Sequence, residues 1–167
     1  MKNLFNDYLN FANRLADEAG IISMDYWRTS LDVENKSHQN PVTIADKKTE
    51  LKLRSMIEKE YPDHGILGEE FESINPDAEF VWVIDPIDGT HIFMSGHKDF
   101  GNLISLTQNK KPIIGIINCP AHAERWVGAK NQNSTINKQP SRTSSVTKIE
   151  DAYFLTSGLY FIEPHLR

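Results

Sequence analysis

The middle of the chain reads Phe80-Val81-Trp82-Val83-Ile84-Asp85-Pro86-Ile87-Asp88-Gly89-Thr90, an apolar run followed directly by two aspartates. Five consecutive apolar residues bounded by turn-forming residues predict a buried strand over 80–84. Asp85 and Asp88 then emerge together at the carboxyl end of that strand, where binding sites are common. Pro86 fixes its own φ angle and Gly89 permits a left-handed backbone, so the two carboxylates can be aimed at one point.

The residues on either side of Pro62 have different patterns. Before it, apolar side chains recur at spacings of three and four, which predicts a helix over 5–26 and a second over about 43–61, with a polar loop or short hairpin at 31–41 between them. After it, short apolar runs between glycine, proline and asparagine predict strands. Besides 80–84, these runs are 65–68, 103–106, 113–117 and 125–128. Two helices followed by several strands predict an α+β fold, with the helices packed on one face of a largely antiparallel sheet.

The last part of the chain predicts a domain boundary. Residues 131–148 are polar and predict a connector, and Ala152–Ser157 predicts a new strand close to the end at Arg167. We therefore expect an N-terminal domain over 1–148 and the start of a second domain over 149–167. A simple C-terminal edge strand is the alternative. A strand without a covering layer leaves apolar surface and an unpaired edge exposed, so we expect self-association or poor solubility.

Composition excludes several classes of protein. The 167 residues are 39% apolar and 25% charged, as in a globular domain, and the net charge of −5 leaves no basic excess for nucleic acid or anionic lipid. We therefore expect neither nucleic acid nor membrane as a partner. The apolar runs are far shorter than the roughly 20 residues that cross a bilayer. The N-terminal residues do not resemble a signal peptide, and Cys119 is the only cysteine, so we expect a cytoplasmic protein.

Two further acidic positions accompany Asp85 and Asp88. Glu69 and Glu70 follow Gly68 directly after an apolar pair, and Asp46 lies near the start of the second predicted helix. Each position has a structural alternative: a first-turn helix acid for Asp46, solvated loop charges for the glutamates, and turn formation for the two aspartates. Clustered carboxylate and carbonyl oxygens would instead suit a hard cation such as Mg²⁺ or Mn²⁺.

Taken together, the segments 41–46, 68–70 and 85–90 resemble, in order and spacing, the inositol monophosphatase superfamily of Mg²⁺-dependent phosphomonoesterases. Later residues, including Phe100-Gly101 and 124–128, look most like its histidinol-phosphatase branch. The resemblance covers nearly the whole chain. It implies the layered helix and sheet fold of that family and hydrolysis of a small phosphorylated metabolite, with histidinol phosphate as the first choice. An inositol, sugar or nucleotide phosphatase, a catalytically impaired metal-binding fragment and an acidic structural domain stay open as alternatives.

The resemblance also implies which residues hold metal. Glu69, Asp85 and the main-chain carbonyl of Ile87 would hold one Mg²⁺ ion, while Asp85 and Asp88 would hold a second ion that bridges to the substrate. Mn²⁺ is the alternative ion. Clustered cations neutralise the charge of a phosphomonoester, lower the pKa of a bound water and stabilise the leaving group.

Catalytic and phosphate-binding roles follow from the same resemblance. Thr90, hydrogen-bonded to Asp46, would orient and help to deprotonate the attacking water. Glu70 would serve as an auxiliary acid beside the first metal ligand. The backbone N–H groups of Gly89 and Thr90 would hold phosphate oxygens at the start of a short helix.

One feature of the family is missing from the sequence. Full-length members continue with a further domain, which supplies another metal-binding aspartate in a Trp-Asp-x-Ala-Ala-like segment, and no such segment occurs between 129 and 167. We therefore interpret the chain as truncated after the N-terminal domain, with doubtful activity alone. Its expected association is either a homodimer or a complex with a separate C-terminal half.

Overall fold

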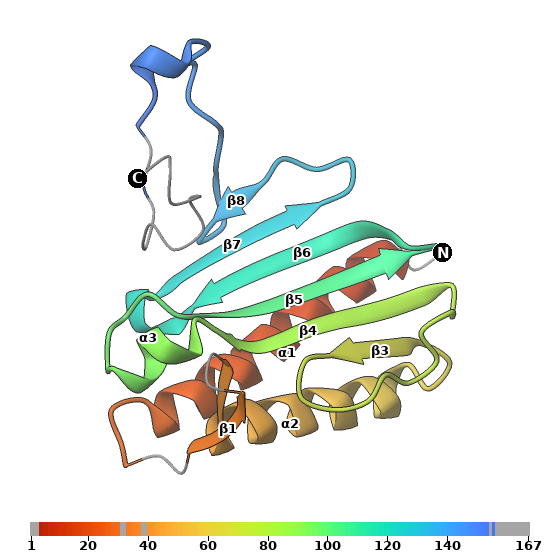
Figure 1. Cartoon of the computed structure of the whole chain (residues 1–167). Helices are drawn as coiled ribbons and strands as arrows, with labels where there is room; N and C mark the ends of the chain where they lie inside the picture. The colour runs from red at the N-terminus through yellow and green to blue at the C-terminus, as the bar shows by residue number, and fades with distance from the viewer. Residues whose placement is uncertain (1–3, 31–32, 38–39, 154, 156–167) are drawn as a thin grey trace.

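The computed structural model describes residues 4–30, 33–37, 40–153 and 155, which form a helical layer against one sheet (Figure 1). The helices are α1 (Leu4–Tyr26), α2 (Ile44–Glu60) and the short α3 (Thr90–Met94), with 3-10 turns at Pro120–His122 and Ile149–Asp151. The strands of the sheet are β3 (Gly65–Gly68), β4 (Phe80–Asp88), β5 (Gly101–Gln108), β6 (Lys111–Cys119), β7 (Glu124–Ala129), β8 (Thr135–Ile136) and β9 (Gln139–Pro140). The predicted α+β fold is confirmed.

The seven strands lie in sequence order across the sheet. β3 pairs with β4 in parallel, and every other neighbouring pair is antiparallel. A separate hairpin, β1 (Val33–Ser37) with β2 (Asn40–Thr43), forms where a loop or short hairpin was expected. β8 and β9 lie within the segment predicted to be a connector. Strands of two residues are too short to show an alternation of apolar residues, so only backbone pairing, of β8 with β7 and of β9 with β8, reveals them.

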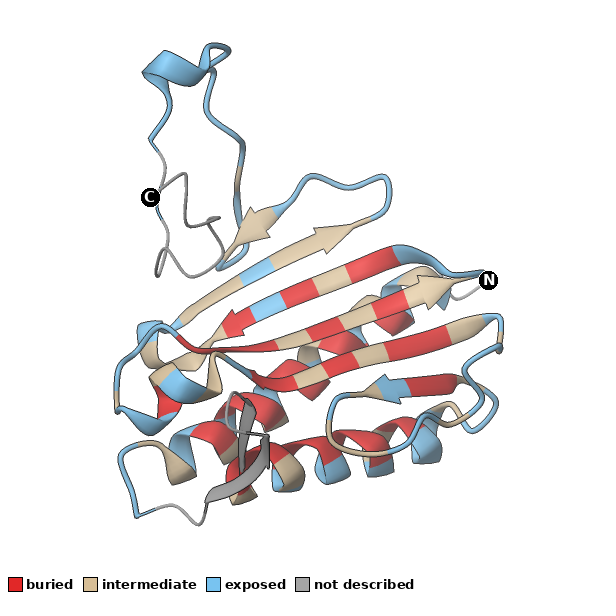
Figure 2. Ribbon diagram, in the orientation of Figure 1, coloured by how far each residue is buried: buried red, intermediate tan, exposed pale blue. Residues whose placement is uncertain are grey.

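The core lies between the helices and one face of the sheet. α1 packs on β5 and β6, and α2 packs on β4. The buried Trp82 of β4 meets the ring of Phe11 of α1 edge to face, with 5.2 Å between ring centroids. Along β4, β5 and β6 buried residues alternate with less buried ones (Figure 2), as expected for a sheet covered on one face.

The opposite face of the sheet has no helix over β5 and β6 among the described residues (Figure 1). Ile117 and Trp126, on neighbouring strands of this face, keep 50% and 39% of their surface exposed. Of the segment predicted to be a strand, Ala152 and Tyr153 belong to no helix or strand, and most of the rest lies outside the described residues. The boundary at residue 148 stays a prediction. None of the described helices is long and apolar enough to cross a membrane.

Candidate metal and phosphate site

A β-bulge at the end of β4 places the two aspartates on the same face of the sheet. Asp85 pairs with Leu103 and Asp88 pairs with Gly101, so Pro86 and Ile87 both lie opposite a single β5 residue. On a regular strand, side chains three positions apart point to opposite faces. The extra residue resets this alternation, and Asp85 and Asp88 both line one cavity of about 620 Å³ on the uncovered face of the sheet.

Asp85 lies near enough to three other carboxylates for their charges to act on it. Burial raises the pKa of Asp85 from 3.8 to about 7, with contributions from the charge of Glu69, the charge of Asp88, a hydrogen bond with the Glu69 side chain and the charge of Asp46. Asp85 Oδ1 is also buried without a hydrogen-bond partner among the described residues. The structure therefore brings Asp46, Glu69, Asp85 and Asp88 together, although they come from three separate segments of the chain.

Asp46 has a structural role as well. It is the third residue of α2, and its Oδ2 accepts hydrogen bonds from the backbone N–H (2.8 Å) and the hydroxyl of Thr43, which completes a capping box. Burial raises the pKa of Asp46 although these hydrogen bonds lower it. The hydroxyl of Thr90 donates instead to the Ile87 carbonyl at 3.2 Å. The hydrogen bond expected between Thr90 and Asp46 is thus replaced by bonds to other partners, because the helix cap satisfies Asp46 and the tight turn after β4 satisfies Thr90.

A buried glutamate that the sequence reading missed holds the Glu69–Glu70 segment. The Glu50 carboxylate accepts hydrogen bonds from the backbone N–H groups of Glu69 (3.0 Å) and Glu70 (2.8 Å), and it pairs with Arg54 at 2.8 Å. A Cβ at Gly68 would lie 2.0 Å from Glu50 Oε1, so any larger residue there would have to displace this buried carboxylate. A signal was present in the sequence, since Glu50 lies on the same stripe of the helix as the apolar core residues.

The turn into α3 has the conformation expected from its glycine. Gly89 lies in the left-handed region at φ 84°, and Thr90 begins α3. Glu70 is half-buried and Glu69 is exposed. The role of the backbone N–H groups of Gly89 and Thr90 in holding phosphate stays a prediction, and so does the role of Glu70 as an acid.

The donor set suits a hard divalent cation. Carboxylates and a carbonyl are the ligands that Mg²⁺ and Mn²⁺ prefer, and crowded carboxylates with a raised pKa and a buried unpaired oxygen are stabilised by a positive charge. In the described part of the chain, no three His, Cys, Asp or Glu side chains are already placed around one point as ligands. The cluster is therefore a set of adjacent donors and not a completed coordination sphere.

Comparison with known proteins identifies the family. A family model described as the inositol monophosphatase family matches residues 6–161. The chain belongs to the inositol monophosphatase family. It is 40% identical over 156 residues to the bifunctional phosphatase IMPL2, chloroplastic, of Arabidopsis thaliana, covering 92% of this chain and 44% of that protein. It is 34% identical over 158 residues to a histidinol-phosphatase of Chlorobaculum parvum, covering 93% of this chain and 61% of that protein.

Two solved structures share the fold of this chain. An inositol monophosphatase from Zymomonas mobilis is 40% identical with a TM-score of 0.75, covering 87% of this chain and 56% of that chain. The extragenic suppressor protein SuhB from Bartonella henselae is 27% identical with a TM-score of 0.80, covering 84% and 55%. The chain thus spans about half the length of the relatives that it matches.

Proposed function

We propose that this chain supplies the metal-binding part of a phosphatase that hydrolyses a small phosphomonoester. The observation that supports this most directly is the convergence of Glu69, Asp85, Asp88 and Asp46, with Asp85 Oδ1 buried and unpaired. A purely structural domain gains nothing from placing a buried carboxyl beside other carboxylates, which raises the pKa of Asp85, whereas a bound cation would stabilise that arrangement.

Three side chains and one backbone carbonyl of this chain are the proposed cation ligands. Glu69, Asp85, Asp88 and the Ile87 carbonyl would hold Mg²⁺, with Mn²⁺ as the alternative. When bound, the cation supplies charge neutralisation of the phosphoester and activation of water. The Ile87 carbonyl already accepts the Thr90 hydroxyl, which fixes its direction.

Three other groups complete the proposed chemistry. Thr90 would orient the attacking water and, with Asp46, help to deprotonate it. The support is that the charge of Asp46, held by the cap of α2, acts on Asp85. Glu70, whose backbone N–H is bound to the buried Glu50, would serve as an auxiliary acid. The N–H groups of Gly89 and Thr90 would hold phosphate oxygens.

We propose histidinol phosphate as the substrate. The support is that relatives from Chlorobaculum parvum and Mycobacterium tuberculosis, 34% and 32% identical, are histidinol-phosphatases by name. An inositol monophosphate is the second candidate, because a relative from Mesembryanthemum crystallinum, 28% identical, is named inositol monophosphatase. We also propose that the uncovered face of the sheet, which includes Ile117 and Trp126, is covered in the working enzyme by a second copy or by a separate C-terminal half.

Phosphate release from both candidate substrates tests the proposal. The wild type, Asp88→Ala and the exposed control Asp77→Ala are assayed with Mg²⁺ and with chelator. We expect Mg²⁺-dependent release by the wild type and by Asp77→Ala, and its loss in Asp88→Ala. Equal rates for all three proteins in both conditions would end the proposal. Metal binding without turnover would instead support the catalytically impaired fragment.

A further inference from the structure

The bulge that directs Asp85 and Asp88 is held by a buried amide side chain on the next strand. Asn102 is the one residue opposite Pro86 and Ile87, and its side chain is fully buried. Its Nδ2 donates to the Pro86 carbonyl at 2.7 Å. A bulge disrupts the backbone ladder locally, and a buried carbonyl without a donor is costly. The Asn102 side chain therefore supplies a donor at the point where the backbone pairing shifts.

The Asn102 amide can take only one orientation, because a network of side-chain hydrogen bonds fixes it. Arg125 has donors only, and its Nε donates to Asn118 Oδ1 at 3.0 Å. Asn118 must then present Nδ2 to Asn102 Oδ1, at 2.9 Å. That contact leaves Asn102 Nδ2 for the Pro86 carbonyl and for the Ser23 hydroxyl, at 2.7 Å. If the Asn102 amide were flipped, its Oδ1 would face the Pro86 carbonyl oxygen, and no hydrogen bond could form between the two acceptors.

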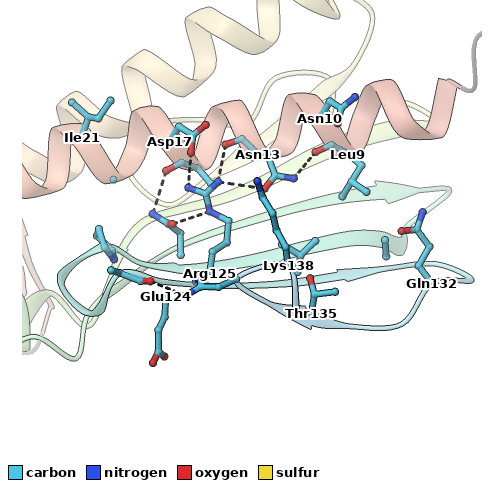
Figure 3. A pocket seen from close by; sticks show the side chains of 18 of the residues that line it. Leu9, Asn10, Asn13, Asp17, Ile21, Glu124, Arg125, Gln132, Thr135 and Lys138 are labelled. Carbon is cyan, nitrogen blue, oxygen red and sulfur yellow. Dashed lines mark hydrogen bonds and ion pairs between the residues drawn. The ribbon is translucent and has the colours of Figure 1, made fainter. Parts of the chain in front are cut away.

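The outer end of this hydrogen-bond network, Arg125, is bound to side chains of α1. Arg125 reaches from β7 toward the helix, where Asp17 and Asn13 meet its guanidinium group (Figure 3). The Arg125–Asp17 ion pair measures 2.7 Å, and the contact with Asn13 Oδ1 measures 3.3 Å. The hydrogen-bond network thus runs from the wall of a cavity of about 1000 Å³ beside α1 to the bulge between Asp85 and Asp88.

We infer that Asn102 is a positioning residue for the proposed metal site, with Asn118 and Arg125 fixing its orientation. By holding the Pro86 carbonyl it keeps the bulge, and the bulge keeps the carboxylates of Asp85 and Asp88 on the same face. Without that donor the Pro86 carbonyl loses a buried hydrogen bond, and the two aspartates lose their fixed relation. The inference rests on the proposed function, since it concerns the same cation site.

Binding of Mn²⁺ alone, followed by its electron paramagnetic resonance signal in the full 167-residue chain, tests the inference. Asn102→Ala removes the donor. Thr107→Val is the matched control, because Thr107 also lies on β5 and its hydroxyl donates to a β4 carbonyl, that of Val81, at 3.2 Å, away from the bulge. We expect the Kd for Mn²⁺ to rise about 10-fold in Asn102→Ala, with a changed spectrum of the bound ion. Thr107→Val is expected to keep the wild-type Kd and spectrum.

The outcomes separate the two claims. If the wild type binds Mn²⁺ and Asn102→Ala binds it equally well, the inference is wrong while the proposed metal site stands. If the wild type itself binds no Mn²⁺, both are wrong. If Asn102→Ala does not fold, Mn²⁺ binding is measured instead for Arg125→Met, which changes the partly exposed end of the hydrogen-bond network. Weaker Mn²⁺ binding than in Thr107→Val supports the inference, and equal binding overturns it.

Discussion

Replacing Glu50 by glutamine should destabilise the chain strongly, although the substitution preserves shape. The Glu50 carboxylate is completely buried and accepts backbone N–H groups of Glu69, Glu70 and Phe71, at 3.0, 2.8 and 3.3 Å. It also pairs with Arg54, whose side chain is only 7% exposed. Glutamine has one acceptor oxygen in place of two and no charge, so the Arg54 cation is left buried without its counter-charge.

The magnitude follows from the burial of this pair. Removing one partner of a buried salt bridge costs about 3–5 kcal/mol. Glutamine keeps one acceptor for the backbone N–H groups, so we expect the lower end, about 3 kcal/mol. For a chain of this size 1 kcal/mol lowers Tm by roughly 2–4 °C, which gives a fall of roughly 6–12 °C.

Urea unfolding followed by circular dichroism measures this loss. Glu58→Gln is the matched control, because Glu58 lies on the same helix and is exposed. We expect the control to keep the wild-type free energy of unfolding within about 0.5 kcal/mol. A Glu50→Gln variant within the same limit would refute the reasoning, since the buried carboxylate would then not hold the Glu69–Glu70 segment.

Three further predictions follow from the site. Gly68→Ala should destabilise the chain, because the new Cβ would lie 2.0 Å from a buried carboxylate oxygen, whereas Gly115→Ala, with no atom within 4 Å, should leave the urea midpoint unchanged. Because the pKa of Asp85 is raised from 3.8 to about 7 in the fold, the metal-free folded chain holds a proton that the unfolded chain releases. The free energy of unfolding should therefore fall as pH rises between those two values, and urea titrations of Asp85→Asn should show a smaller fall. Thr43→Ala should cost about 1 kcal/mol through loss of the α2 cap, and a thermal melt equal to wild type would contradict the capping box.

Much of the fold could be predicted from the sequence because its signals are local. The spacing of apolar residues predicted α1 and α2 to within a residue or two, since each helix shows one apolar stripe to the sheet. Short apolar runs predicted β3 to β7 in order. The extension of β4 through Asp88 was not predicted, because proline and aspartate are poor strand formers and only the pairing with β5 places them in the sheet.

The candidate site was predicted as a list of residues but not as a geometry. The motif comparison named Asp46, Glu69, Asp85 and Asp88, and the structure brings these carboxylates together. The contacts that hold them, from Glu50 and Asn102, were missed. Both are polar residues at buried positions, and the site backbone groups that they hold lie 16 to 21 residues away in the chain.

Periodicity and motif spacing are properties of neighbouring residues, so they were enough to predict α1, α2, the apolar parts of β3 to β7 and the family. The direction of the carboxylates, and the contacts that hold them, could be read only from the folded chain. The reason is physical: a bulge exists only as a mismatch between two paired strands, and a buried polar side chain is stable only when distant donors and acceptors close around it.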